Sequence, residues 1–354
     1  HYVLNPSSSD DRRYDLSFLS APYDPIKAGV SLHAQKLITQ LAVLAHRKKI
    51  GDCLHELGQG FLELDTLDRL EALGRQSVVL AEQNQIYVTN RLEAGATAPA
   101  EARLATQELE LARLRQEWIA ASRTGLLDGI KTLIGQTNEA SLNLTLDDAS
   151  HEALSGFRPG VDARPRAWSN AVERQMLALG RELRELNVTA ARAAFIPDFR
   201  VGVRTTDVLT DGSGDGLHYT VGLEWPLWDG WKRFRRIDRE KTALLQYDLL
   251  SETKEAEWRK RWQDAEADLR AAGIERRRAG LDEEQAALKA EQVAAGFQTG
   301  GQTFAAVLQT RRDLLQAQRQ AIIKTLQRDK AALYLGHLSY DWMARYAADI
   351  PIEE

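Results

Sequence analysis

Two stretches in which apolar and polar residues alternate predict a β-hairpin. Apolar side chains occupy every second position from Phe199 to Val203, and again from Leu217 to Trp225. Because a strand places successive side chains on opposite faces, each stretch predicts a strand with one apolar and one polar face. Residues 211–216, with the sequence DGSGDG, predict the polar loop between them. A shorter alternation at residues 14–18 predicts a further strand.

Most of the remaining chain has the composition of long helices. Residues 30–94 and 232–299 consist largely of Leu, Ala, Glu, Gln and Arg, which are good helix formers. Residues 99–135 and 303–346 predict shorter return helices, and residues 168–194 predict another helix. Apolar residues recur at intervals of seven in both return helices, which is typical of a coiled-coil seam: Leu104, Leu111, Trp118 and Leu308, Leu315, Ile322. We expect most of these seam residues to lie in the core of a helix bundle.

The same order of segments occurs twice along the chain. Residues 19–27 resemble residues 223–232, and residues 81–95 resemble residues 286–300 at an offset of 205. The chain is therefore interpreted as two copies of one unit: strand, long helix, tight turn, long helix. This interpretation places the first repeat at 1–135, a connector at 136–167, the second repeat at 168–346 and a tail at 347–354.

The two copies are not equally complete. The second repeat has a helix at 168–194 and a strand at 195–206 ahead of Pro226, whereas the matching positions of the first repeat fall before His1. We therefore expect the native gene to encode an upstream helix and strand. Without them, the protomer would contribute three strands instead of four.

The strands have the pattern of a transmembrane barrel wall. Each spans about ten residues, which is the length that crosses a bilayer on a tilt. The polar face would then line a wet lumen with Asp198, Arg200, Arg204, His218 and Glu224. Trp225, Trp228 and Trp231 follow the second strand, where an interfacial aromatic belt is expected. The alternative is an ordinary amphipathic sheet packed on helices in a soluble protein.

The barrel interpretation has a consequence for assembly. About eight strands are needed to close a barrel, so the strands of one chain must combine with those of other copies. The predicted fold class is mainly α with a small β portion, in which long antiparallel helical hairpins accompany short strands of a shared β-barrel.

Composition and charge exclude several function classes. The 354 residues include 46 basic and 51 acidic side chains, and the mild net charge of −5 argues against a nucleic-acid binder. A single cysteine, Cys53, excludes an intrachain disulfide. The sequence contains no run of about 18 apolar residues, so it predicts no transmembrane helix.

No motif in the sequence predicts catalysis. The seven histidines lack metal-ligand spacing, and no phosphate-binding loop follows a strand. We therefore expect no catalytic residue, no cofactor and no metal, and the protein is not predicted to be an enzyme. The basic runs at 233–236 and 276–278 are interpreted as solvated helix faces.

Three segments resemble the TolC-like outer-membrane factor family. Residues 190–199 (AARAAFIPDF), 221–230 (VGLEWPLWDG) and 297–309 (FQTGGQTFAAVLQ) are similar, in this order, to the strand entry, strand exit and helical-hairpin tip of that family. Residues 91–107 resemble the tip in the first repeat, so that the resemblance covers nearly the whole chain.

The resemblance implies a homotrimer in the cell outer membrane, with most of its mass in the periplasm. A shared β-barrel would continue into a long α-helical barrel, and the trimer would serve as the passive exit duct of an efflux or type I export complex. A periplasmic adaptor protein would meet the hairpin tips and link them to an inner-membrane transporter. The alternative function is a periplasmic coiled-coil adaptor or scaffold, although adaptors usually carry one such hairpin and this chain has two.

The resemblance also implies roles for residues at the two tips. The adaptor contact would include Gly95, Ala96, Thr97, Gly300, Gly301 and Gln302. A periplasmic gate would involve Glu101, Gln302 and Gln309. The family often places Asp and Arg at this entrance, but the second tip here is uncharged, and Glu101 can equally be an acid that stabilises a helix start.

Overall fold

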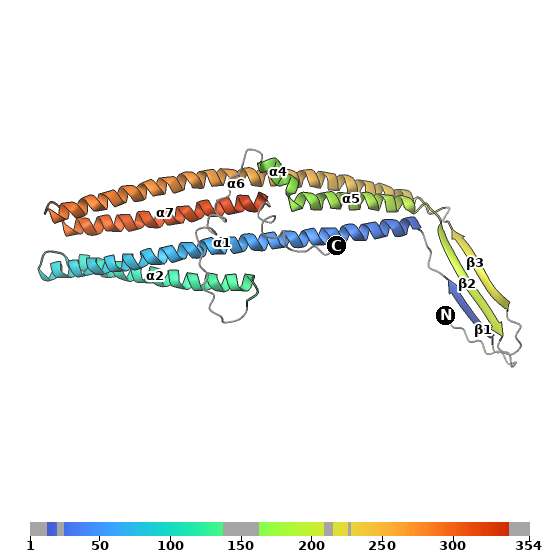
Figure 1. Cartoon of the computed structure of the whole chain (residues 1–354), viewed down its shortest axis with the longest axis horizontal. Helices are drawn as coiled ribbons and strands as arrows, with labels where there is room; N and C mark the ends of the chain where they lie inside the picture. The colour runs from blue at the N-terminus through green and yellow to red at the C-terminus, as the bar shows by residue number, and fades with distance from the viewer. Residues whose placement is uncertain (1–12, 20–24, 137–162, 209–214, 226–227, 340–354) are drawn as a thin grey trace. The chain divides into compact units, whose positions relative to one another are not determined.

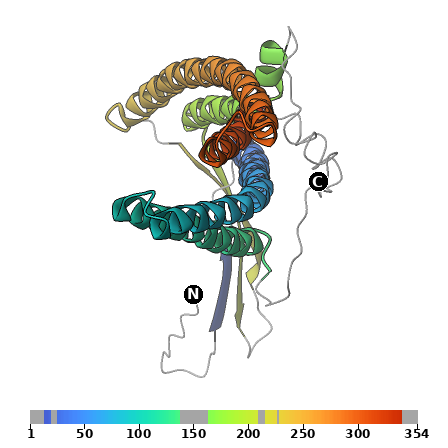
Figure 2. The ribbon, with the colours of Figure 1, turned by 90° about the vertical axis from the view of Figure 1, so that its left-hand side faces the viewer.

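The computed structural model describes residues 13–19, 25–136, 163–208, 215–225 and 228–339. Its longest elements are α1 (Pro25–Glu93) and α6 (Lys232–Gln298). Each is followed by a shorter helix, α2 (Pro99–Leu133) and α7 (Phe304–Ser339). In both views α2 runs alongside the C-terminal part of α1, and α7 runs alongside α6 (Figure 1, Figure 2). The four predicted long helices are therefore confirmed, except that residues 340–346 lie outside the described residues.

The region before the hairpin contains two helices where the sequence predicted one. Helix α4 (Ala163–Asn170) begins inside the expected connector, and α5 (Val172–Ala193) follows a break at Ala171. Ala167 and Ala171 are buried, so tertiary packing holds this short helix, and the bounds of the connector stay a prediction. None of the helices in the described part of the chain is long and apolar enough to cross a membrane.

Three antiparallel strands form one sheet in the order β1-β2-β3. Their bounds are β1 (Arg13–Leu19), β2 (Asp198–Val208) and β3 (Asp215–Glu224). The register places Phe18 opposite Val203, and Val203 opposite Tyr219. The strand of the first repeat thus pairs with the hairpin of the second, which confirms all three expected strands. The expected strand end at residues 2–4 lies outside the described residues.

The chain forms two compact units, and each takes residues from both repeats. The first unit comprises residues 1–46 and 172–256 and contains the sheet. Its helices are joined by a hydrogen bond of 2.9 Å between His33 Nε2 and Glu182 Oε1 and by an ion pair in which Arg181 Nε lies 2.9 Å from Asp248 Oδ1. Val188 and Ala191 of α5 are buried in this unit, as the pattern of an amphipathic helix requires.

The second unit comprises residues 47–171 and 257–354. Its main core contains Trp258 and Trp262 of α6, which stack with ring centroids 5.4 Å apart, and Leu335 of α7. Trp168 of α4 lies 5.1 Å from the Trp258 ring and so ties the short helix to this core.

The seam residues of the two return helices differ in exposure. Leu308 of α7 is 2% exposed, in agreement with a core position. Its counterpart Leu104 in α2 is 59% exposed, and Leu111 and Trp118 are exposed as well. The expectation that most seam residues lie in a core is therefore wrong for α2 in a single chain, because no element of the described chain covers this stripe.

Candidate membrane-contact and hairpin-tip sites

One face of the sheet is apolar and open to solvent. Phe199 pairs with Leu223, and Val201 pairs with Val221, so these side chains share a face. All four, together with Tyr219, are between 47% and 76% exposed. An exposed contiguous apolar surface of this kind marks a contact with lipid or with another protein.

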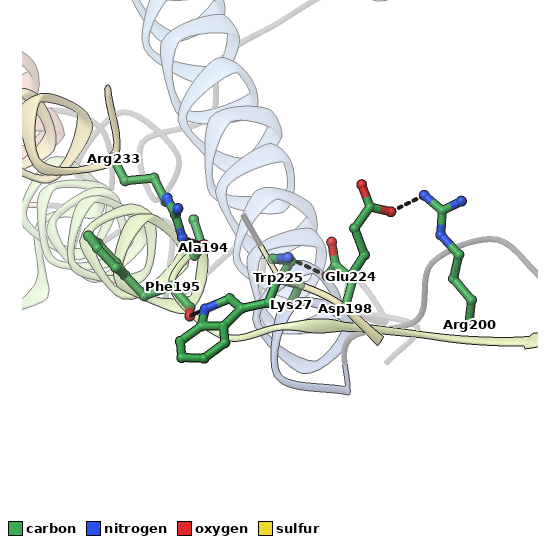
Figure 3. Close-up of polar contacts among 8 residues, drawn as sticks. All are labelled: Lys27, Ala194, Phe195, Asp198, Arg200, Glu224, Trp225 and Arg233. Atoms are coloured by element: carbon green, nitrogen blue, oxygen red, sulfur yellow. Dashed lines mark hydrogen bonds and ion pairs between the residues drawn. The ribbon is translucent and has the colours of Figure 1, made fainter. Parts of the chain in front are cut away.

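The opposite face carries polar side chains that bond to one another and to α1. Arg200 forms an ion pair with Glu224 across β2 and β3 (Figure 3). Asp198 accepts a hydrogen bond of 2.6 Å from Lys27 Nζ, which ties the start of β2 to the first turn of α1. His218 is exposed on β3. Arg204 is opposite His218 in the register, but its side chain lies outside the described residues.

Polar contacts of Arg233, at the start of α6, join this helix to the segment that follows β3 and to the segment that precedes β2. Arg233 Nε donates to Asp229 Oδ2 at 2.9 Å. Arg233 Nη1 donates to the Ala194 carbonyl at 3.3 Å, and both of these residues are drawn in Figure 3. The guanidinium also lies 5.0 Å from the centre of the Phe195 ring. The hydrogen bond from Arg233 is the main reason that the pKa of Asp229 is lowered. The expectation that this basic run is solvated is therefore wrong for Arg233.

The spacing of two residues in the sequence indicates the contact between Arg233 and Asp229. Asp229 stands four residues before Arg233 and four residues after Trp225, the end of the predicted strand. Gly230 and Trp231 both have positive φ, 63° and 68°, so the chain reverses sharply here before α6 begins. The turn brings the Asp229 carboxylate back over the first turn of α6.

The three tryptophans of the predicted aromatic belt are all exposed. Trp225 Nε1 donates to the Phe195 carbonyl at 3.1 Å (Figure 3). Trp228 packs edge-on against Trp231 at 6.1 Å, and Trp231 packs on Phe234 at 5.2 Å. Each tryptophan thus combines a fixed position with an outward apolar surface, although their role as a membrane belt stays a prediction.

The two hairpin tips have the same backbone structure. Gly95 has φ 68°, its N–H donates to the Leu92 carbonyl, and the Ala96 N–H donates to the Arg91 carbonyl. Gly300, with φ 79°, is bonded in the same way: its N–H donates to the Phe297 carbonyl, and the Gly301 N–H donates to the Gly296 carbonyl. This is the glycine-terminated end of a helix described as a Schellman motif. The repeat read from the sequence is thereby visible in individual hydrogen bonds.

The expected gate residues make local contacts in this chain. Glu101 accepts a hydrogen bond from the Thr97 hydroxyl at the start of α2. Gln309 Nε2 donates to Asp313 Oδ1 at 2.9 Å, one turn further along α7. Among the described residues, no hydrogen bond joins Glu101, Gln302 and Gln309 to one another. Their part in a gate, and the contact of Ala96, Thr97 and Gln302 with an adaptor, stay predictions.

Two exposed apolar stripes run along the helices of the second unit. The first is the seam of α2, which borders a groove of about 810 Å³ lined by Leu111, Trp118 and, from α7, Leu315. The second stripe, on α6, contains Ile274, Leu281 and Leu288, again seven residues apart and 57% to 66% exposed. Within the described ranges, no three His, Cys, Asp or Glu side chains gather closely enough to hold a metal ion.

Several solved membrane-channel structures have a fold similar to that of this chain. It matches CusC, whose crystal structures concern transmembrane channel formation, with a TM-score of 0.77, 14% identity and coverage of 96% of this chain and 81% of that one. It matches the outer membrane protein VceC of Vibrio cholerae with a TM-score of 0.72 and 14% identity, over 96% and 84% of the two chains. The open-state MtrE outer membrane channel of Neisseria gonorrhoeae matches with a TM-score of 0.74 and 15% identity, over 96% and 79%.

The chain has the fold of TolC-type outer-membrane channels. The resemblance drawn from the three sequence segments is thus confirmed at the level of the fold. No family model matches the chain, and no curated protein sequence matches it.

Proposed function

We propose that this chain is one protomer of an outer-membrane efflux channel. The fold it shares with such channels supports this function, as does a sheet whose apolar side chains face outward. The protein would act as a passive duct, without catalytic residues or a cofactor. It would lie in the outer membrane with most of its mass in the periplasm.

The observation that carries the proposal is the open sheet of three strands with one exposed apolar face. In the described chain β1 and β3 are edge strands, and unpaired edges invite pairing with other copies. Closure of a barrel needs about eight strands, so two copies with six described strands are too few and a third copy is required. A homotrimer with a shared β-barrel meets this condition.

The helices support the same assembly. The stripes on α2 and α6 expose apolar residues at heptad spacing, which is the pattern of coiled-coil contacts. Contact of these stripes with neighbouring copies would bury them and close an α-helical barrel around the duct.

The hairpin tips would be the docking points for the rest of an efflux or type I export complex. Two tips with the same backbone hydrogen-bond pattern, at Gly95 and Gly300, would present a repeated surface to a periplasmic adaptor. The adaptor would connect the duct to an inner-membrane transporter. The gate would rely on Glu101, Gln302 and Gln309, with less charge than is usual at such entrances.

The experiment is to purify the full chain in mild detergent and to measure its mass, its shape by electron microscopy and its conductance in planar bilayers. A threefold tube that conducts ions is expected. Leu281→Glu should dissociate it, whereas Arg276→Glu, which adds an acid at an exposed position on the opposite side of α6, should leave it assembled. A monomeric particle without conductance in any bilayer would overturn the proposal.

A further inference from the structure

The first two turns of α6 carry four cationic side chains on one face. They are Lys232, Arg235, Arg236 and Arg239, spaced i, i+3, i+4 and i+7, and all four residues are exposed. Residues at these spacings lie on the same side of a helix. Arg233 does not belong to this basic stripe, because it turns inward to Asp229 and Ala194.

The basic stripe has no internal counter-charge. Arg235 Nη2 donates to the Gly230 carbonyl at 2.9 Å, but in the part of the chain that the structure describes no carboxylate lies within ion-pair distance of the four cations. The first turn of α6 also lacks an acid, and the helix dipole disfavours cations at this end. The Asp229 carboxylate lies over this turn but is bonded to Arg233, so the four cations of the stripe are left to an anionic partner outside the fold.

The neighbours of the basic stripe identify the kind of partner. Trp228, Trp231 and Phe234 form a chain of contacting rings that is 50% to 77% exposed. Arg235 is bonded to the turn that carries Trp231, so the cations border these rings directly. Exposed tryptophans favour the headgroup level of a bilayer, and cations just beyond them are placed to meet lipid phosphates.

We propose that the basic stripe binds the phosphate groups of anionic phospholipids at the surface of the bilayer. The inference rests on the proposed insertion of the sheet into a membrane, since the three tryptophans lie in the sequence between the end of β3 and the start of α6. Tryptophan side chains would set the depth of the protein, and the four cations would select the headgroup. A soluble anion that passes through the duct is a different ligand, and the test separates it from lipid.

The test compares vesicles of phosphatidylcholine alone with vesicles that contain roughly one third phosphatidylglycerol, because each cation near an anionic surface strengthens binding severalfold. The full chain is floated with each kind of vesicle, and the bound fraction is measured against lipid concentration at low and high salt. The variant K232Q/R235Q/R236Q/R239Q removes the basic stripe. The matched control R270Q/R276Q/R277Q/R278Q removes four exposed cations from the distal part of α6, outside the first unit.

The expected result is that the wild-type chain and the control prefer the anionic vesicles by about tenfold or more, and that this preference disappears in the stripe variant and in high salt. Trp228→Ala should weaken binding to both kinds of vesicle alike, because it removes an apolar contact and no charge. Helix content measured by circular dichroism verifies that each variant is folded.

Two results would overturn the inference. One is an unchanged preference for anionic vesicles in the stripe variant. The other is a change in the ion selectivity of the channel without a change in lipid preference, which would place the cations in the duct. Binding to vesicles without insertion or conductance would instead contradict the proposed channel. A preference for anionic vesicles that depends on the basic stripe would still support the headgroup site in that case.

Discussion

Glu108 and Arg312 are 204 positions apart in the sequence, and Arg312 Nη2 lies 2.6 Å from Glu108 Oε2. The separation equals the offset of 204 that relates the seam residues of the two return helices, such as Leu104 and Leu308, so Glu108 and Arg312 occupy equivalent positions of α2 and α7. Equivalent positions with opposite charges meet across the groove in the second unit. Divergence of the two copies has thus produced a complementary contact between them.

Exchange of the two charges tests this contact. Glu108→Gln and Arg312→Gln should each lower the free energy of unfolding by up to about 1 kcal/mol, since both side chains are partly exposed. The exchanged variant Glu108→Arg/Arg312→Glu should recover most of that loss. A double-mutant cycle from urea unfolding measures the coupling, and a coupling of zero would mean that the pair contributes nothing.

Gly180 permits the close approach of α5 to α6 within the first unit. A Cβ atom at Gly180 would lie 2.0 Å from the Tyr247 hydroxyl and 2.7 Å from the ring carbon that carries it. Gly180→Ala should therefore destabilise the protein by about 1–3 kcal/mol, because a packed ring must move. Gly273→Ala is the matched control: nothing lies within 4 Å of its Cβ, and it should stabilise α6 by about 0.5–1 kcal/mol.

The hairpin tips need glycine for a different reason. No atom lies within 4 Å of a Cβ at Gly95 or Gly300, so the cost of Gly95→Ala or Gly300→Ala comes from the positive φ alone. Each substitution should destabilise its hairpin by about 1–2 kcal/mol, whereas Gly129→Ala, in an open position of α2, should not. Hydrogen exchange at the tip amides provides the measurement. Equal protection in the glycine and alanine proteins would contradict the prediction.

His55 makes stability depend on pH. Burial, and then the charge of His337, lowers the pKa of His55 from 6.5 to about 4. The two rings stack at 4.6 Å, and the titratable groups of Asp52 and Tyr334 also lie beside them. Between these two pKa values the unfolded chain binds a proton that the folded chain does not, so stability falls as the pH falls from 6.5 to 4.

The matching variant is His55→Gln. It should reduce the loss of unfolding free energy between pH 6.5 and pH 4 by about 1–2 kcal/mol, a value lowered to allow for the partial exposure of the ring. Urea unfolding of both proteins at several pH values gives the difference between their free energies of unfolding. The titration of the carboxylates, which both proteins share, cancels in this difference. An identical slope for both proteins would show that His55 is not the responsible group.

Regular patterns in the sequence were sufficient for much of the fold. Heptad spacing and helix-forming composition predicted α1, α2, α6 and α7, and strict alternation predicted β2 and β3. The similarity between residues 81–95 and 286–300 predicted two equivalent tips, and both end on a glycine with positive φ. These features follow from local periodicity and backbone sterics, which act over a few residues.

The sites depended on contacts between distant segments. Asp198 was assigned to a lumen by alternation alone, but Lys27 bonds to it from 171 positions away. Arg233 was assigned to a solvated run, and only the turn at Gly230 and Trp231 shows why it points inward. No pattern within one segment contains such partners.

By itself, the sequence determined the elements of this protein, their order and their duplication, because helix and strand periods are properties of neighbouring residues. Only the tertiary structure decided which members of each repeated pair are buried. Leu308 lies in a core and Leu104 does not, although the two leucines occupy matching positions of the two repeats. Glu108 and Arg312 also occupy matching positions, and only the folded chain shows that they form a contact. The reason is that burial depends on which surfaces meet after folding, and two similar helices with different neighbours do not bury the same face.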